Sequence, residues 1–133
     1  MIRGRCECAS IQYEVAGDVS DFCHCHCSQC RRLQGAPYVS FAGVRESKIS
    51  WKSGRDELKV YASSDKNDRY FCPKCGAHIM VISQEEPGVA YLTMGCVEGH
   101  PDLPPAYHQF VASKAPWLDI CDGLPQYPES IDD

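Results

Sequence analysis

Eight consecutive positions near the start of the chain, residues 23–30, contain four cysteines and two histidines. A hydrophobic core does not require such a composition. Thiolates and imidazoles are ligands for soft or borderline metal ions, and zinc binds them in tetrahedral sites at about 2.3 and 2.0 Å. Two further cysteine pairs lie far from this cluster in the sequence, Cys6 with Cys8 and Cys72 with Cys75. These residue types predict metal binding, so the question is how the thiols divide among sites.

Cys72 and Cys75 belong to a CPKCG segment, in which two thiolates can bind one ion while Gly76 takes a positive φ where the loop folds under it. Such a pair needs two more ligands. Cys6 and Cys8 can supply them, because residues i and i+2 of an extended chain point to one face and a bend brings their sulfurs together. We therefore predict a closed, structural zinc site of four cysteines that joins the start of the chain to its later half.

Within the dense cluster, Cys25, Cys27 and Cys30 combine a CxC and a CxxC spacing that share the middle cysteine. Three thiolates on one short loop can fix three corners of a tetrahedron and leave the fourth to water, a side chain or a substrate, as catalytic zinc requires. The alternative is a second structural site, closed by one of the neighbouring ligands Cys23, His24 or His26. Along a strand, the first of these would face the same way as Cys25.

Composition and charge narrow the class of protein. The 133 residues fit one domain, and no apolar run approaches the ~20 residues of a membrane span. The segment before Cys6 has no apolar targeting stretch, so we expect a cytoplasmic protein with reduced cysteines, whose pattern is typical of metal binding or catalysis and not of disulfide cross-linking. The net charge of −5 and the pI near 5.5 argue against a nucleic-acid partner, which would need a basic surface.

Short segments rich in β-branched and aromatic residues recur about every ten residues, which predicts an all-β domain of packed antiparallel sheets. The expected strands are 10–15, 21–25, 38–44, 48–51, 58–61, 68–71, 77–82, 89–94 and 107–112. One short helix is expected through Arg31, capped by Ser28 and ended by Gly35. We predict a single zinc-binding domain over residues 1–127 and a loose acidic tail over 128–133.

The order and spacing of the cysteine motifs resemble the glutathione-dependent formaldehyde-activating enzymes, a zinc family that also contains centromere-protein-V-like members. The resemblance covers nearly the whole chain and rests on GRCEC at 4–8, CHCSQCR at 25–31, GAPY at 35–38, FCPKCG at 71–76, PAYH at 105–108, KAPW at 114–117 and DGLP at 122–125. The chain departs from the family pattern at Cys23 and His24, at Ala9, where many relatives carry glycine, and at Cys96, where an apolar residue is expected.

The resemblance implies a β-tent fold stapled by zinc, which agrees with the strands predicted above. It also implies two zinc ions per chain as cofactors. The ligands would divide as the spacing indicates, with a structural zinc on Cys6, Cys8, Cys72 and Cys75 and a second zinc on Cys25, Cys27 and Cys30.

The activity that the resemblance implies is carbon-sulfur chemistry. Zinc with an open position would hold an incoming thiol as thiolate or polarise a carbonyl oxygen. Adding glutathione to formaldehyde gives S-hydroxymethylglutathione, and the reverse reaction cleaves the C-S bond. Many relatives are only candidate carbon-sulfur lyases, so we predict a zinc-dependent lyase acting on a small thiol adduct, with glutathione as a candidate substrate. The alternative is a zinc-stapled protein-binding module without catalysis, in which both sites are structural.

Glutathione carries two carboxylates, so its site should present cations near the metal. Arg31 and Arg32 directly follow Cys30 and can serve, or they can stabilise thiolates or face solvent. Tyr38 and His108 lie in matching motifs and are weaker candidates for lining the pocket. We expect the remaining cysteines and both tryptophans to be packing residues, namely Cys96, Cys121, Trp51 and Trp117.

Overall fold

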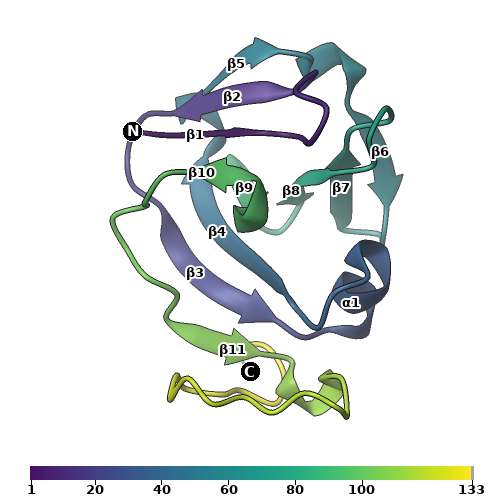
Figure 1. Ribbon diagram of the computed structural model, residues 1–133, viewed down its shortest axis with the longest axis vertical. Helices are drawn as coiled ribbons and strands as arrows, with labels where there is room; N and C mark the ends of the chain where they lie inside the picture. Colours follow the sequence, from purple (N-terminus) through teal and green to yellow (C-terminus); the bar gives the residue numbers. More distant parts are fainter. Residues whose placement is uncertain (133) are drawn as a thin grey trace.

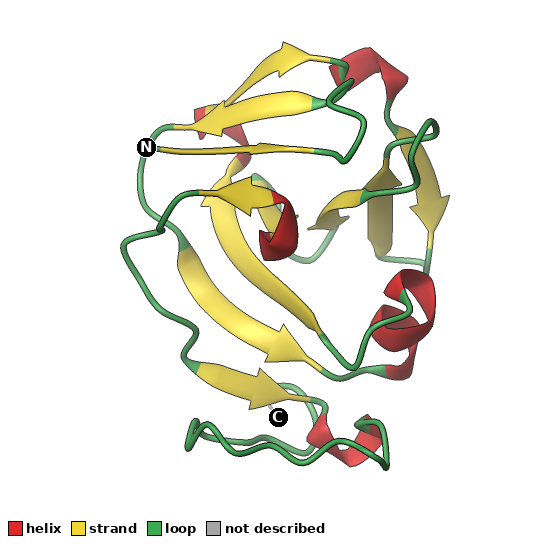
Figure 2. Cartoon of the chain, in the orientation of Figure 1, coloured by secondary structure: helices red, strands yellow, loops and turns green. Residues whose placement is uncertain are grey.

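The computed structural model describes residues 1–132, which form two β-sheets with little helix (Figures 1 and 2). The smaller sheet has the order β10-β1-β2-β5, with β1 (Ile2–Arg5), β2 (Gln12–Val15), β5 (Ile49–Ser53) and β10 (Val97–Glu98). The larger sheet has the order β11-β3-β4-β9-β8-β7-β6, with β3 (Ser20–Cys25), β4 (Val39–Arg45), β6 (Lys59–Ala62), β7 (Asn67–Phe71), β8 (His78–Ser83), β9 (Val89–Thr93) and β11 (Tyr107–Gln109). The all-β prediction is confirmed.

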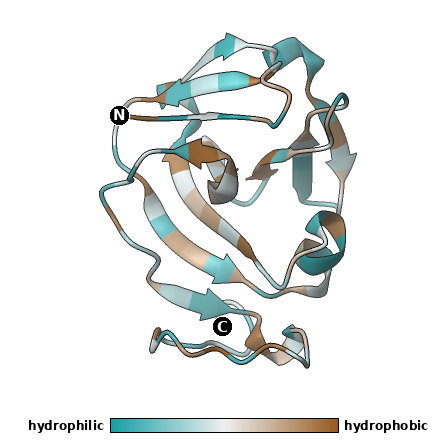
Figure 3. Cartoon of the chain, viewed as in Figure 1, coloured by the Kyte–Doolittle hydropathy of each residue, from teal (hydrophilic) through white to brown (hydrophobic). Residues whose placement is uncertain are grey.

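The hydrophobic core lies where the two sheets pack on each other. The smaller sheet contributes Tyr13 and Val15, which are at most 1% exposed, and the larger sheet contributes Ala42, Ile79 and Leu92, which are fully buried. Hydrophobic positions along β4 are visible in the middle of the molecule (Figure 3). Alternation of buried and exposed residues along β1 and β2 follows from the two-residue period of a strand with one face in the core.

Helix α1 (Ser28–Gln34) follows β3 directly and is the one α-helix among residues 1–132. Its predicted end at Gly35 is confirmed, because this glycine adopts the left-handed conformation (φ +58°) and its N–H bonds Arg31 O. The predicted N-cap was wrong. Cys27, not Ser28, precedes the first turn, and its sulfur accepts a hydrogen bond from Cys30 N. A thiol that was expected to bind metal therefore also starts the helix.

Four short 3₁₀ turns complete the regular structure of the described residues, at Glu46–Lys48, Arg55–Glu57, Met94–Cys96 and Val111–Ser113. The last of these replaces the second half of the strand predicted over 107–112, where Phe110 takes a φ of +57° and ends β11. β11 pairs with β3 in parallel, unlike the antiparallel pairs that join the other named strands of residues 1–132. The parallel arrangement arises because a long connection, and not a hairpin, returns the chain to β3.

Two packing predictions near the end of the chain were wrong. Trp117 is 72% exposed, and Cys121 is also exposed. Trp51 does pack against the core, with its ring 5.5 Å from that of Tyr13. Both wrong predictions fall in the long segment after β11, where few strands are available to cover a side chain.

The segment predicted as a loose tail, 128–133, begins with residues whose backbone is hydrogen-bonded. Phe110 N donates to Glu129 O at 2.9 Å, and Ala112 N donates to Pro128 O at 3.1 Å. The predicted domain boundary at residue 127 stays a prediction, and the last residue lies outside the described part. Within residues 1–132, no helix combines the length and the apolar character needed to cross a bilayer.

Candidate metal centres

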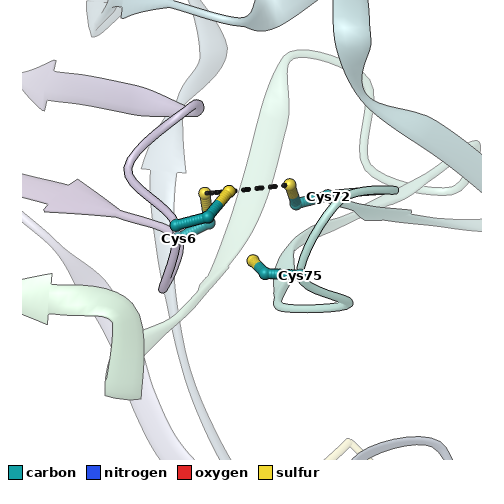
Figure 4. A group of neighbouring side chains, drawn as sticks. Cys6, Cys72 and Cys75 are labelled. Atoms are coloured by element: carbon teal, nitrogen blue, oxygen red, sulfur yellow. Dashed lines mark hydrogen bonds between the residues drawn. The ribbon is translucent and has the colours of Figure 1, made fainter.

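The first cysteine group joins two distant loops. Cys6 and Cys8 lie between β1 and β2, and Cys72 and Cys75 follow β7, yet one sulfur from each lies within 4.8 Å of every other. Figure 4 shows Cys6 facing Cys72 and Cys75 across the gap between these loops. The structure thus brings together the four residues that the sequence paired.

The spacing of these sulfurs fits one tetrahedral ion. Cys6 Sγ lies 3.6 Å from Cys8 Sγ, which lies 3.8 Å from Cys72 Sγ. Four sulfurs at about 2.3 Å from a zinc ion would be about 3.8 Å apart. A set of four thiols with no nitrogen or oxygen ligand is typical of structural zinc, so these residues fit the ion that the family resemblance implies.

Local backbone geometry holds the second loop in place. Gly76 has a φ of +80°, as predicted for the residue that turns the loop under the thiols, and its N–H bonds Cys72 O at 2.8 Å. Ser10 Oγ lies 3.0 Å from Cys8 Sγ and 3.4 Å from Cys72 Sγ. Burial alone would raise the pKa of Cys72, but hydrogen bonds from Ser10 and from the N–H groups of Cys75 and Lys74 bring it down to about 6. Cys72 therefore favours the thiolate, which is the form that binds metal, whereas burial raises the pKa of Cys6.

The second cysteine group lies where β3 passes into α1. Cys25 ends the strand, Cys27 caps the helix and Cys30 lies in its first turn, so one short stretch of chain brings three sulfurs within 4.8 Å of one another. Cys30 Sγ lies 2.9 Å from Cys27 Sγ and 3.6 Å from Cys25 Sγ. Hydrogen bonding with Cys25, and then with Cys30, holds the pKa of Cys27 well below its ordinary value. A thiolate is therefore favoured at the centre of the group.

A buried arginine faces this group, which sequence reasoning missed. Arg69 in β7 is 5% exposed, and its two terminal nitrogens donate to Cys30 Sγ at 3.7 and 3.6 Å. Its Nε also donates to Ser63 Oγ at 3.1 Å. A guanidinium at this distance stabilises negative charge on the sulfurs. A single arginine between Asp68 and Tyr70 forms no local pattern in the sequence, and its burial is seen only in the structure.

A cavity of about 830 Å³ opens over the second group, within the range of small-molecule sites. Cys25, Cys27, Cys30 and Arg69 line it, together with Cys23. Its rim is acidic, with carboxylates from Asp21, Glu85, Glu86, Glu129 and Asp132. Among the described residues that line the cavity, the guanidinium is the one basic group.

The residues considered for closing the second group lie outside it. Cys23 is on the same face of β3 as Cys25, as predicted, but does not join the three sulfurs. Its thiol bonds the Tyr107 hydroxyl, and burial raises its pKa to about 11. His24 points to the opposite face, and His26 Nε2 bonds His108 Nδ1 at 2.8 Å. Among residues 1–132, no fourth Cys, His, Asp or Glu ligand joins the group.

The four predicted substrate-binding residues do not line this cavity. Arg31 Nε donates to Ser113 O at 3.0 Å, and Arg32 is exposed on α1. Tyr38 and His108 line a separate cavity of about 300 Å³ near Asp122. The substrate-binding roles of these four residues stay predictions, and Arg69 is the cation that the structure places beside the thiols.

Comparison with known proteins supports the resemblance. The family model described as glutathione-dependent formaldehyde-activating enzyme matches residues 1–113. A protein of Fusarium vanettenii, provisionally named a glutathione-dependent formaldehyde-activating enzyme, is 31% identical over 86 residues, which cover 62% of this chain and 46% of that protein. An uncharacterized lyase of Schizosaccharomyces pombe is 29% identical over 73 residues, covering 55% of this chain and 51% of the lyase. The chain spans about half the length of these curated relatives.

A solved structure shares the fold. The crystal structure of a Rhodobacter sphaeroides protein has a TM-score of 0.62 and 24% identity, and covers 75% of this chain and 91% of its own. At this identity the likeness shows the architecture alone. The centromere-protein-V-like part of the resemblance stays a prediction. The family match, which covers most of the chain including all three cysteine motifs, shows that this chain belongs to the glutathione-dependent formaldehyde-activating enzyme family.

Proposed function

We propose that this chain is a zinc-dependent carbon-sulfur lyase that forms and cleaves an S-hydroxymethyl adduct of a small thiol. The observation that supports it most is the group of Cys25, Cys27 and Cys30 at the wall of the 830 Å³ cavity, with no fourth ligand from the described chain. A closed site would have no position for a substrate. Family membership and the names of the relatives support the same class of reaction.

The proposed zinc assignment is a structural ion held by Cys6, Cys8, Cys72 and Cys75 and a second ion held by Cys25, Cys27 and Cys30. The second ion, when bound, would supply Lewis-acid stabilisation of a thiolate or a carbonyl oxygen. Arg69 offsets the negative charge of the thiolates through its contacts with Cys30. Its burial and its hydrogen bond to Ser63 hold the guanidinium beside Cys30.

The overall reaction needs no oxidant and no further reactant. The sulfur of a thiol bonds the carbon of formaldehyde, the C=O bond becomes a single bond, and the thiol proton ends on the oxygen. The reverse reaction breaks the C-S bond and returns the proton to sulfur. A site that places the two reactants together lowers the barrier in both directions, because orientation alone can supply several powers of ten in rate.

The charges of the cavity indicate which small thiol fits. Glu85 already pairs with Lys66 Nζ at 2.7 Å, and Glu86 accepts a hydrogen bond from the Tyr91 hydroxyl at 2.6 Å. Asp21, by contrast, has no charged partner among the described ion pairs. An acidic rim favours a substrate with an ammonium group. Cysteamine carries an ammonium group and no carboxylate, so it fits these charges better than glutathione, whose two carboxylates would have Arg69 as their one cation in the described lining. Both thiols are substrates to test.

The second reading, a zinc-stapled protein-binding module without catalysis, requires the chain itself to close the second site. Cys23, His24 and His26 were the candidates, and each is engaged elsewhere or turned away from the three sulfurs. Geometry therefore favours the lyase. We further propose a cytoplasmic location, since the thiols must stay reduced to bind metal, and a small molecule as the partner with no nucleic acid or membrane.

The deciding experiment measures exchange between free formaldehyde and its thiol adduct by NMR exchange spectroscopy. With the zinc-loaded protein and glutathione, the exchange rate should exceed the uncatalysed rate. Cys30→Ser should abolish the acceleration while the four-cysteine group keeps its zinc. Cys23→Ala is the matched control, because this thiol lines the cavity but lies outside the group, and it should change the rate less than about threefold.

The proposal fails if folded, fully metallated protein accelerates neither the glutathione nor the cysteamine reaction. It also fails if Cys30→Ser retains the full rate, since the three-thiol group would then have no part in the chemistry. Metal content and far-ultraviolet circular dichroism of each variant separate both outcomes from simple unfolding.

A further inference from the structure

Two histidines and one aspartate from three separate segments meet on the face of β3 opposite the cysteines. His24 lies in β3, His108 in β11 and Asp122 in the segment that follows β11. One ligand atom of each lies within 4.8 Å of those of the other two. The metal sites that we propose for the lyase use none of these residues, so this cluster is a separate feature of the molecule.

Hydrogen bonds already orient both imidazoles. His24 Nδ1 lies 2.7 Å from Ser40 Oγ, which leaves Nε2 of that ring for another partner. His108 Nδ1 lies 2.8 Å from His26 Nε2, and its Nε2 lies 2.8 Å from Asp122 Oδ2. Imidazoles that bind metals usually bond a second group through the other ring nitrogen, which fixes the ring. Both rings in this cluster show that arrangement.

Burial and access also suit an ion. His26 and His108 are at most 1% exposed, so the rings at the base of the cluster are held in the protein interior. The Asp122 side chain, by contrast, is 42% exposed. It borders the 300 Å³ cavity, which Tyr38, Asp119 and Cys121 also line. An ion bound between the imidazoles and the carboxylate would therefore have a path from solvent and an open coordination position.

We propose that His24, His108 and Asp122 form a binding site for a third metal ion, a divalent transition metal such as Zn²⁺ or Co²⁺. Two neutral imidazoles and one carboxylate are a borderline ligand set that suits these ions and not Mg²⁺ or Ca²⁺, which prefer oxygen ligands. Without the ion, His108 Nε2 donates its hydrogen to the Asp122 carboxylate. The ion would take the place of that hydrogen, so His108 would carry its hydrogen on Nδ1 and donate it to His26 Nε2, whose own hydrogen would move to Nδ1. Both rings would stay neutral, and the ion would join the segment around residue 122 to β3.

A titration with Co²⁺ of the protein that carries two zinc ions, one for each cysteine group, tests this inference. We expect one additional equivalent to bind by calorimetry, with no zinc released. Its absorption should show ligand-field bands without the thiolate-to-cobalt charge-transfer band that cysteine ligands produce. Dialysis against Zn²⁺ alone should likewise raise the metal content by one equivalent.

Two variants and two matched controls locate the ion. His24→Ala and Asp122→Asn should each weaken Co²⁺ binding at least about tenfold. His100→Ala and Asp102→Asn replace the same residue types at exposed positions outside the cluster and should leave binding unchanged. Asp122→Asn replaces an exposed side chain with one of the same shape, so it keeps the test valid if His24→Ala does not fold.

Three results would overturn the inference: no additional equivalent at millimolar Co²⁺, an additional equivalent that both variants bind as tightly as the wild type, or a charge-transfer band showing that the ion lies on thiolates. The inference does not depend on the proposed lyase activity. The experiment measures metal binding by the resting protein. A negative result would therefore not count against the proposed lyase activity, and a lack of lyase activity would not count against this metal site.

Discussion

Successive residues of β3 place thiols on one face of the strand and an imidazole on the other. Cys23 and Cys25 face the larger cavity, whereas His24 turns to the histidine cluster and bonds Ser40. The two-residue period of a strand is sufficient to separate them. A stretch that looks like one metal-binding motif in the sequence therefore contributes to two separate places in the structure.

Ala9 has a backbone conformation that is unfavourable for an alanine. Its φ is +64°, in the region that L-residues avoid and glycine tolerates, and it follows the first cysteine pair directly. We predict that Ala9→Gly raises the free energy of unfolding by up to about 1 kcal/mol, because the strain removed exceeds the added freedom of the unfolded chain. Urea unfolding of the zinc-loaded protein measures it.

The matched control is Ala62→Gly, at an exposed position of β6 with no positive φ. There the change should lower the free energy of unfolding, by roughly 0.5–1 kcal/mol. The prediction is wrong if both glycine variants lose stability equally.

The buried histidine His26 makes stability depend on pH. Burial, followed by the charge of His108, lowers its pKa to about 4, below the unfolded value of about 6.5. Between these values the unfolded chain binds the proton and the folded protein does not, so the contribution is complete above about pH 6.5 and is lost on acidification toward 4. We expect a loss of at most about 2 kcal/mol from this residue after solvent screening.

Unfolding of the wild type and of His26→Gln, measured from pH 7 to pH 4, isolates that contribution. The loss of zinc in acid affects both proteins, so only the difference between their pH profiles counts. The acid-dependent loss should be smaller in the variant, and parallel profiles would contradict the assignment.

Among the elements, α1 depends on its C-terminal glycine. Gly35 has a φ of +58°, and a Cβ added there would meet no atom within 4 Å, so the cost of a side chain is purely conformational. Gly35→Ala should lower the free energy of unfolding by about 1 kcal/mol. Gly95→Ala is the control, because that site is equally open but has no positive φ. Equal effects in thermal unfolding would show that the left-handed cap is not the cause.

Strands and helix ends could be predicted where a few neighbouring residues carry the pattern that determines them. The alternating pattern of β2 and the glycine after α1 are visible in a few residues, and both predictions were confirmed. β1 and β10 were missed, since β1 has only four residues, one of them glycine, and β10 has two. Those two strands form because they pair with each other, and pairing with a strand far away in the chain cannot be predicted from a short stretch of sequence.

The residues of the candidate sites could likewise be predicted where neighbouring residues form a motif, and not where they approach from a distant part of the chain. Spacing within a loop gave the three members of the second cysteine group and each pair of the first group, and the need of a tetrahedral site for four ligands joined the two pairs. Arg69, which approaches Cys30 of α1 from β7, and Asp122, which approaches His108, had no such signal. The exposure of Trp117 was also missed, because a large aromatic residue is usually buried and only the full structure shows that nothing covers it.

At the scale of the whole molecule, the two cysteine groups should affect stability very differently. The first joins both sheets across distant loops, and a structural zinc supplies about 10 kcal/mol or more of folding free energy in small domains. We therefore predict that Cys72→Ser unfolds the chain. Cys30→Ser should stay folded with one zinc fewer, since the second group lies within one short stretch of chain.

Circular dichroism together with metal analysis distinguishes the two variants. Two zinc ions in the wild type, one in folded Cys30→Ser and a loss of ordered structure in Cys72→Ser would agree with the assignment. Equal collapse of both variants would mean that the second group is as structural as the first.

The separation of 64 residues between Cys8 and Cys72 has a consequence for synthesis. At about 5–20 residues per second, a ribosome needs roughly 3–13 seconds to add the later pair after the earlier one. During that interval the first two thiols have no partner loop and can react with oxidants or pick up the wrong ion. The segment that is synthesised first would thus be among the last to be fixed in place. If the proposed zinc site forms, its correct assembly would require reducing conditions and available zinc while the nascent chain grows.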